Sequence, residues 1–319
     1  MTLHSFLHRM LIRPYEMTIF RSFNTPWYRT HGVDVGRPPK SSKKTENGGY
    51  QKNPFYHKVD NIRHYLNSRG EYYCSLMSAL LMRLKPKSKK KENPLQYILE
   101  SACQFYDAIY VDEFQDFREA DYLLLMELAA VAKDITLVGD YYQHSVFGDA
   151  NSGKPFSKKK NKWYSYSEFI TMMQENGFEV DTESLKESRR CSEAVCAFVR
   201  DKLGIDIMGA DHPGDIISLD SCNTPQNQID AILQDDTIPK LIFSQANEYQ
   251  GRYINWSYSK GDTYDDVCVI LTKGTSSICD PDWICTVKEI TKNKLYVALT
   301  RARHHVYLLS SERFKQLSV

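Results

Sequence analysis

The stretch from residue 108 to residue 148 reads AIYVDEFQDFREADYLLLMELAAVAKDITLVGDYYQHSVFG. It contains two short apolar runs, at 108–111 and 135–138, and an apolar helical pattern at 123–131 lies between them. A strand-like run, a helix and a second strand-like run in this order predict a βαβ unit with parallel strands. We therefore expect an α/β protein whose sheets are mainly parallel.

Polar side chains follow both apolar runs. Asp112 and Glu113 come directly after the first run, and Asp140 and Gln143 come after the second. Ligands bind at the carboxyl ends of strands in such units, so we expect these four side chains to share one edge of the sheet. An acidic pair there suits metal-phosphate chemistry, in which one carboxylate holds Mg²⁺ and its neighbour polarises a water. Taken alone, an Asp-Glu pair after a strand is more often a pair of solvated loop acids.

The sequence around the acidic pair favours a functional site over a pair of solvated loop acids. VDEFQD at 111–116, followed by LVGDxxQ at 137–143, resembles motifs II and III of superfamily 1 helicases of the UvrD/Rep type. Other segments resemble further motifs of that family in the family's own order, from a single-stranded DNA segment through motifs IV, V and VI: TLHSF at 2–6, LKESRR at 185–190, YSKGDTYDDV at 258–267 and LYVALTRAR at 295–303. The resemblance runs from residue 2 to about residue 310. VDEFQD and YVALTRAR are individually specific, whereas the Lys-Gly pair of motif V alone would be weak.

Two segments, motif V and the one that ends in motif VI, resemble a particular subfamily of these helicases. SKGDTYDDV and TKNKLYVALTRAR look closest to the helicase-like subunit of Gabija anti-phage systems. This resemblance implies a role in anti-phage defence and a nuclease partner.

The family resemblance implies catalytic roles residue by residue. Asp112 would hold Mg²⁺, Glu113 would orient water as the general base, and Gln143 would couple the γ-phosphate of ATP to the DNA contacts. Arg190 and Arg301 would act as arginine fingers that stabilise charge in the transition state. ATP would sit between two domains, and its hydrolysis would drive movement along one DNA strand.

Further binding roles follow from the same resemblance. Nucleotide contacts are implied for Arg189, Asp140 and Gly261. DNA contacts are implied for the following residues: Thr2, His4, Ser5, Phe147, Ser257 and Lys260. Phe147 is the candidate base-stacking aromatic, and a core phenylalanine is the alternative.

The chain departs from the family pattern at several of these positions. Arg189 stands where the family has an adenine-stacking tyrosine, although a guanidinium plane can also stack. Asn255, Ser257 and Thr263 replace the Thr, His and Glu of motif V. These replacements put the nucleotide and DNA contacts of motif V in doubt.

The resemblance implies two RecA-like domains, the first truncated at its N-terminus. Residues 1–179 are expected to form domain 1A, with a small helical insert similar to subdomain 1B at about 30–95. Residues 180–319 are expected to form domain 2A, and the short interval between Arg190 and motif V leaves no room for a large 2B subdomain.

Composition and periodicity predict the secondary structure within these two domains. Residues 30–60 are rich in Pro, Gly, Lys and Ser and predict a loop or a loosely ordered insert. A helical pattern follows at 60–84, and another runs from 163 to 177 and ends in glycine. Strands are expected in the second domain at 240–244, 267–272 and 305–310.

A helicase of this family also needs a glycine-rich loop, with a lysine and a Ser or Thr, to hold the phosphates of ATP. That loop belongs well upstream of the TLHSF segment, which here begins at residue 2. We therefore expect the 319-residue chain alone to bind ATP and Mg²⁺ weakly or not at all and to hydrolyse ATP negligibly. The run Gly148–Lys154 fits GxxxxGK, but Pro155 stands where a hydroxyl must reach Mg²⁺ and SKKKNK follows, so we do not interpret it as this loop.

Composition excludes several classes of protein. The chain has no run of about 18 apolar residues and no secretory start, so we expect a soluble, cytoplasmic protein without membrane contact. Eight cysteines without a CxxC pair predict reduced thiols, mostly buried, and no zinc site. A net charge of +1 means that any DNA binding must come from local basic patches.

Three basic clusters fall in the first expected domain: Lys40/Lys43/Lys44, Lys85/Lys87/Lys89/Lys90/Lys91 and Lys158/Lys159/Lys160/Lys162. Each cluster alone is more often a solvated loop. Together they could form a surface that tracks the phosphates of single-stranded or partly duplex DNA.

Three hypotheses remain open from the sequence. The first is a DNA helicase ATPase whose hydrolysis needs a longer, full-length form. The second is a catalytically inactive helicase-like subunit that binds DNA or a nuclease partner. The third is an ATPase completed by a phosphate loop from another polypeptide.

Overall fold

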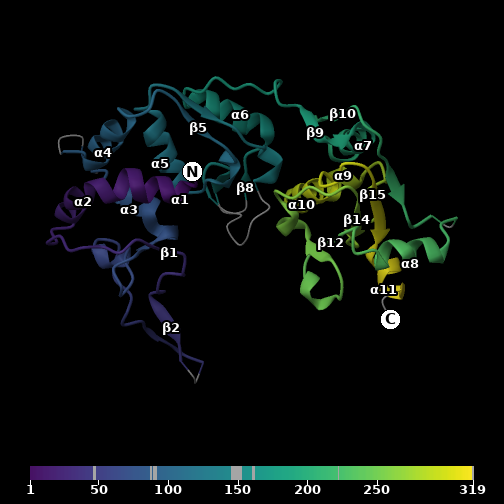
Figure 1. The fold of residues 1–319 in the computed structure, drawn as a ribbon, viewed down its shortest axis with the longest axis horizontal. Coiled ribbons are helices and arrows are strands. Elements are labelled where there is room, and N and C mark those ends of the chain that lie inside the picture. Colours follow the sequence, from purple (N-terminus) through teal and green to yellow (C-terminus); the bar gives the residue numbers. More distant parts are fainter. Residues whose placement is uncertain are drawn as a thin grey trace. The chain divides into compact units, whose positions relative to one another are not determined.

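A computed structural model describes the chain except residues 46–47, 87, 89–91, 145–152, 160–161, 222 and 318–319, and the side chains of residues 159 and 162. The chain divides into two compact units, Met1–Gly139 and Asp140–Val319 (Figure 1). This division falls before the boundary expected between residues 179 and 180. It does so because the segment after Gly139 bonds to the C-terminal part of the chain, for example through Asp140 and Tyr296.

Unit 1, Met1–Gly139, is built around an N-terminal run of helical segments. The run consists of α1 Leu3–Phe6, the π-helical η1 Leu7–Ile12, η2 Arg13–Tyr15 and α2 Glu16–Ser22. Its inner face is fully buried through Leu7, Leu11, Ile12, Ile19 and Phe20. The other helices of the unit are α3 Met77–Arg83, α4 Pro94–Cys103 and α5 Ala120–Ala129. Helices α3 and α4 pack against η1, and both also contact α5, so these helices share one apolar core.

The predicted βαβ unit is confirmed in unit 1. Strand β5, Ile109–Val111, pairs in parallel with β6, Ile135–Leu137, and α5 lies between them in the chain. In each strand the outer two residues are half-buried and the middle residue is exposed, so one face of this two-stranded sheet packs inward.

The insert is mixed in structure, and the helical prediction for 60–84 is wrong in its first part. The described elements of the insert are β1 Val33–Asp34, β2 Ser42–Lys44, β3 Tyr50–Lys52, η3 Ile62–His64, β4 Tyr72–Tyr73, η4 Cys74–Leu76 and α3. A turn at 67–70 interrupts the predicted helix, because the side-chain oxygen Oδ1 of Asn67 accepts hydrogen bonds from the backbone N–H groups of Arg69 and Glu71. Gly70 follows with a φ of 78°, which favours glycine. The segment expected to be a loop at 30–60 contains the antiparallel hairpin β2–β3.

Unit 2, Asp140–Val319, contains a five-stranded parallel sheet in the order β11-β15-β14-β12-β13. The strands are β11 Ile216–Ser218, β12 Lys240–Ile242, β13 Tyr253–Asn255, β14 Val267–Leu271 and β15 Val306–Ser310. All five residues of β14 are buried, as expected for a central strand covered on both faces. The strands predicted at 240–244, 267–272 and 305–310 are therefore confirmed as β12, β14 and β15.

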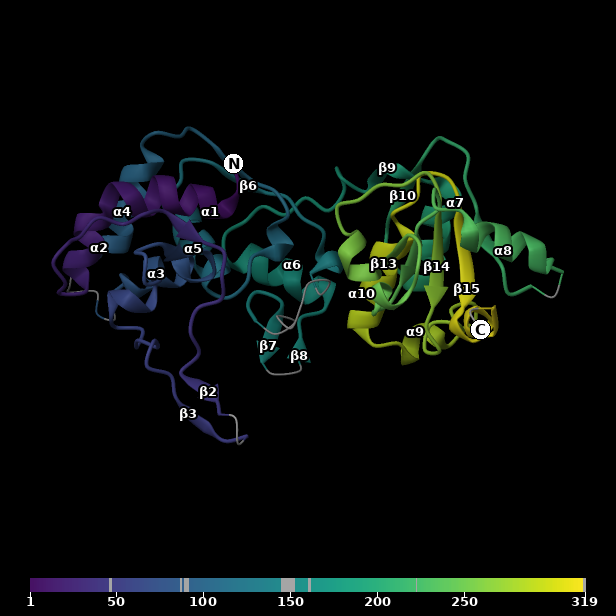
Figure 2. The ribbon, with the colours of Figure 1, turned by 60° about the horizontal axis from the view of Figure 1, so that its bottom comes forward.

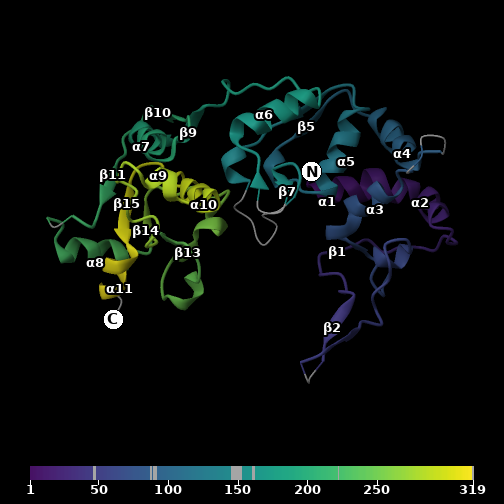
Figure 3. The same cartoon turned by 180° about the vertical axis from the view of Figure 1, so that it is seen from behind.

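Helices cover both faces of this sheet. Residues of α7 Glu193–Leu203, α9 Trp283–Thr286 and α10 Glu289–Leu299 share one apolar cluster with β14 and β15. Residues of α8 Gln226–Gln234 and α11 Ser311–Leu317 share a second cluster with the opposite faces of the same strands. In Figures 1 and 3, strands β14 and β15 accordingly run between these two sets of helices.

The rest of unit 2 consists of short elements. They are η6 Tyr141–Gln143, the antiparallel pair β7 Ser157–Lys159 and β8 Lys162–Trp163, α6 Tyr166–Glu175, the parallel pair β9 Glu187–Ser192 and β10 Met208–Ala210, η7 Ala246–Glu248 and η8 Trp256–Ser259 (Figure 2). The helix predicted at 163–177 is confirmed as α6, and Gly177 follows it with a φ of 89°. Among the helices of the described residues, none has the length and apolarity to span a membrane.

Candidate nucleotide and nucleic-acid site

The acidic pair follows β5 in unit 1, at the position that the sequence predicts. Asp112 and Glu113 are both exposed, and the Glu113 N–H donates a 2.8 Å hydrogen bond to Asp112 Oδ1. Glu113 has a φ of 52° and a ψ of 38°, in the left-handed region that non-glycine residues rarely adopt. Such backbone conformations cost free energy and cluster at functional sites. The strand end is therefore held in a specific shape that presents both carboxylates.

A buried glutamine, Gln115, supports Glu113. The Gln115 side chain is 2% exposed, and its Nε2 donates to Glu113 Oε2. The neighbouring Phe114 N–H donates to Val138 O at 2.9 Å, which ties the acidic turn to the end of β6. A Cβ on Gly139 would collide with Gln115 Oε1 and lie 3.2 Å from the backbone nitrogens of Phe114 and Gln115. Gln115 and Gly139 were not predicted as supporting residues, although both stand inside the motifs VDEFQD and LVGDxxQ.

Asp140 connects the segment after β6 to helix α10 within unit 2. Its carboxylate Oδ2 accepts hydrogen bonds from Gln143 Nε2 at 2.8 Å and from the Tyr296 hydroxyl at 2.7 Å. Its Oδ1 accepts from the Tyr142 N–H at 2.9 Å and caps the η6 turn. Burial, followed by the nearby Asp140 charge, raises the pKa of Tyr296 well above its ordinary value, so this hydroxyl stays protonated as a donor. Tyr296 was not predicted, because only the fold brings it to Asp140.

Two tyrosines fix the η6 turn on the same helix. The Tyr141 hydroxyl lies 3.1 Å from Glu289 Oε1, and the Lys292 ammonium lies 5.4 Å from the centre of the Tyr142 ring. Burial raises the pKa of Tyr142 to about 12 and lowers that of Lys292. Gln143 is thus held by a turn that is anchored at several points.

The two candidate arginine fingers meet at Thr300. Arg190 Nη1 donates a 2.9 Å hydrogen bond to Thr300 O, and Arg301 Nη2 donates a 3.2 Å bond to Thr300 Oγ1. Arg301 is 3% exposed and also donates to the carbonyl oxygens of Val297 and Asp262. Burial, and next the Arg190 charge, lower the pKa of Arg301 to about 10. Two guanidinium groups so close together repel each other, and a bound anion would offset that repulsion.

The other residues of unit 2 that were predicted to contact nucleotide or DNA differ in burial and backbone conformation. Arg189 is exposed, and Gly261 adopts a φ of 87° that only glycine adopts readily. Ser257 and Lys260 are half-buried on and after η8. The Asn255 side-chain oxygen accepts a 2.9 Å hydrogen bond from the Ala246 N–H, so at this motif V position the side chain supports the local fold.

The TLHSF segment forms the first helix, and Phe147 lies outside the described residues. Thr2 is the N-cap of α1 and accepts a 3.3 Å hydrogen bond from the Ser5 N–H, so its side chain has a structural role. His4 is exposed.

The predicted site residues thus fall into two groups. Asp112 and Glu113 belong to unit 1, whereas Asp140, Gln143, Arg190 and Arg301 belong to unit 2. The shared edge expected for the two acidic segments stays a prediction. No group of three or more His, Cys, Asp or Glu side chains among the described residues is placed to hold a metal ion. Mg²⁺ usually keeps several waters and takes one or two carboxylates plus phosphates, so the exposed Asp112 fits one ligand position.

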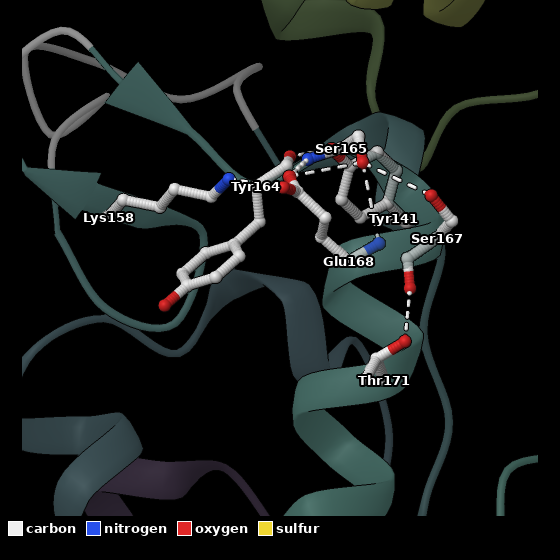
Figure 4. A network of polar contacts seen from close by, with 7 residues as sticks. All are labelled: Tyr141, Lys158, Tyr164, Ser165, Ser167, Glu168 and Thr171. Carbon is white, nitrogen blue, oxygen red and sulfur yellow. Dashed lines mark hydrogen bonds and ion pairs between the residues drawn. The ribbon is translucent and has the colours of Figure 1, made fainter.

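The third basic cluster is partly occupied by a structural ion pair. Lys158 pairs with Glu168, and Glu168 forms a capping box with Ser165 at the start of α6 (Figure 4). The Lys158 hydrogen bond is the main cause that lowers the pKa of Glu168 to about 2. Lys158 is therefore held by this carboxylate, and the side chains at 159, 160 and 162 lie outside the described residues. Lys85 of the second cluster likewise pairs with Glu127.

Comparisons with known proteins agree with the motif pattern in one segment. Residues 35–148 match the UvrD/REP helicase N-terminal domain family. No curated protein matches the chain. Similar solved structures include arterivirus nonstructural protein 10, a helicase solved with DNA, at 17% identity and a TM-score of 0.39 over 67% of this chain and 41% of that chain. They also include a PRRSV helicase, at 17% identity and a TM-score of 0.38 over 65% of this chain and 36% of that chain.

This chain therefore spans about two fifths of the length of these viral helicases. The matched family segment contains the whole of β5-α5-β6, with the acidic pair and the Asp140–Gln143 turn. Residues 35–148 are thus similar to the N-terminal domain of UvrD/REP helicases.

Proposed function

We propose that the protein is a superfamily 1 helicase-like protein that binds single-stranded DNA and the phosphates of ATP. In the complete protein, ATP hydrolysis would drive movement along the DNA strand. The order of the motifs and the family match over residues 35–148 support this proposal. The amino-acid sequence of motif V resembles that of the helicase-like subunit of Gabija anti-phage systems. This resemblance supports a role in anti-phage defence with a nuclease partner.

The observation that carries the proposal is the meeting of Arg190 and Arg301 at Thr300. Both guanidinium groups hydrogen-bond to this one residue, and burial, followed by the Arg190 charge, lowers the pKa of Arg301. Guanidinium groups match phosphate oxygens in charge and geometry, so a phosphate would relieve their mutual repulsion. Gln143, held by Asp140, is the neutral donor of the same unit.

Asp112 and Glu113 supply the acidic half of the proposed chemistry. The Asp112 carboxylate would hold Mg²⁺, which, when bound, neutralises charge on the phosphates. Glu113, whose orientation Gln115 supports, would accept a proton from the attacking water.

A catalytically inactive helicase-like subunit is the second candidate. Two observations favour it: the Asn255 side chain is used in a local hydrogen bond, and each of the three Arg301 guanidinium nitrogens already donates one hydrogen bond within unit 2. Such a subunit would bind DNA or a nuclease partner without turning over ATP.

Equilibrium binding of labelled ATP with Mg²⁺ tests the proposed phosphate site. The first candidate predicts saturable binding in the millimolar range, weakened about tenfold in Arg190→Ala because a charge-assisted hydrogen bond is lost. Lys273→Ala, which removes an exposed cation elsewhere in unit 2, is the matched control and should bind ATP like the wild type. Equal binding by the wild type and Arg190→Ala would contradict the phosphate site.

A further inference from the structure

The hairpin β2–β3 extends away from the helices of unit 1 (Figures 1 and 2). Ser42 pairs with Lys52, Lys43 with Gln51, and Lys44 with Tyr50, in antiparallel register. All six residues of the two strands are exposed. The hairpin therefore adds nothing to the apolar core of the unit, and its side chains are fully available to a ligand.

The two faces of the hairpin differ in chemistry. Side chains alternate along a strand and cross-strand partners share a face, so Lys44, Tyr50 and Lys52 lie on one face. Lys43 and Gln51 lie on the opposite face. We call the first set the tyrosine face. Tyr50 is 76% exposed and lies directly across from Lys44, and Lys52 stands two residues along the same strand.

Among the described residues, no acidic side chain pairs with the lysines of the tyrosine face. Neither strand contains an acidic residue, and in the described part of the chain Lys44 and Lys52 form no ion pair. Between residues 37 and 58 the sequence has six Lys or Arg and one Glu. Lys44 and Lys52 are diagonal neighbours on this face, within reach of each other's long side chains, so their like charges repel, and isolated two-stranded hairpins are marginally stable in water. A polyanion laid along this face would remove the repulsion.

An exposed tyrosine between two lysines has the chemistry of a base-stacking platform. Aromatic side chains stack on the faces of bases, and neighbouring cations take the phosphates of the same strand. The bases of a duplex are already stacked on one another, so an internal base can reach Tyr50 only when it is unpaired.

We propose that the tyrosine face holds single-stranded nucleic acid, with phosphates against Lys44 and Lys52 and one base stacked on Tyr50. The inference rests on the proposed DNA-binding function and assigns it a contact surface. It also makes the hairpin a one-sided contact, since Lys43 and Gln51 face away.

Fluorescence anisotropy with a labelled oligothymidylate tests this proposal on the whole chain. Tyr50→Ala should weaken binding about tenfold, and Tyr50→Phe should restore it, because stacking needs the ring and not the hydroxyl. Lys44→Gln combined with Lys52→Gln should weaken binding and reduce the slope of log affinity against log salt by about 0.7 for each cation removed.

The controls use the same hairpin and the same residue types. Lys43→Gln removes an equal charge from the opposite face and should weaken binding less than Lys44→Gln. Tyr97→Ala removes an exposed tyrosine from α4 and should leave binding unchanged. All five substituted residues are exposed, so the variants should unfold at the wild-type temperature.

The outcomes separate this proposal from the proposed function. Wild-type binding that Tyr50→Ala leaves unchanged, or equal losses from Lys43→Gln and Lys44→Gln, would overturn the tyrosine face and leave DNA binding intact. No binding by the wild type at low salt would overturn both.

Discussion

The Tyr296 hydroxyl donates a 2.7 Å hydrogen bond to Asp140 Oδ2, across 156 positions of the sequence. Asp140 also accepts from Gln143, so one carboxylate connects the motif VI helix to the glutamine expected to contact the γ-phosphate. Within unit 2, a substitution of Tyr296 should therefore affect Gln143, and a substitution of Gln143 should affect Tyr296.

Replacing Tyr296 with phenylalanine should therefore destabilise unit 2. The substitution removes one donor from the half-buried Asp140 carboxylate and should lower the free energy of unfolding by about 1 kcal/mol. Chemical denaturation followed by fluorescence measures this change. Tyr258→Phe is the control: its side chain is 70% exposed, and the substitution should have no effect. Equal stabilities of Tyr296→Phe and the wild type would show that the hydrogen bond contributes nothing.

Gly139→Ala should disturb the acidic turn in unit 1. The new Cβ would collide with Gln115 Oε1, so Gln115 must move and the orientation of Glu113 changes with it. We expect a loss of about 1–3 kcal/mol in the free energy of unfolding. Gly274→Ala meets no heavy atom closer than 4.0 Å and should change stability by less than about 0.5 kcal/mol. A neutral effect of Gly139→Ala would contradict the close approach.

The start of α6 should respond to acid through Glu168. Its pKa is about 2 in the folded chain, below the ordinary value of 4.5, so its stabilising effect is complete above pH 4.5 and is lost as the pH falls through about 2. Carboxyl NMR titration should give this low pKa in the wild type and a higher one in Lys158→Gln. A wild-type pKa near 4.5 would contradict the capping network of Figure 4.

The elements that the sequence predicted correctly are those whose residues alone determine them. The apolar runs of β5 and β6, with the helical pattern of α5 between them, are local signals, and β14 is a continuous apolar run buried on both faces. At residues 60–84 the spacing of Ile62, Tyr65 and Leu66 imitates a helix. The Asn67 turn overrides this spacing, because its side chain takes the backbone N–H groups that a helix would use.

The candidate site was likewise predicted only in part. The acidic pair and its place after β5 follow from the motif, and the two arginines follow from the family resemblance. The left-handed conformation of Glu113 and the support from Gln115 are local, but no motif encodes the backbone angles and side-chain orientation on which they depend. The meeting of both arginines at Thr300 could not be predicted, because the fold brings Arg190 to Thr300 across 110 positions of the sequence.

The polypeptide of residues 1–319 should hydrolyse ATP no faster than its Glu113→Gln variant. Phosphoryl transfer depends on positioning, and Pro155 follows the chain's GxxxxGK run where a hydroxyl is needed. Each charge-assisted hydrogen bond of a phosphate loop contributes roughly 1.5–3 kcal/mol. A steady-state ATPase assay with saturating oligonucleotide measures the rates. Robust turnover that Glu113→Gln abolishes would show that the chain builds a phosphate site of a different kind.

Binding of single-stranded DNA tests the central claim most directly. Labelled oligonucleotides of mixed sequence and a blunt duplex of the same length should be titrated with the wild-type chain at low and moderate salt. We predict weak, sequence-independent binding that favours the single strand and falls with salt, by about 0.7 in log affinity per log unit of salt for each phosphate contacted. Preference for the duplex, or an affinity that does not change with salt, would contradict the account.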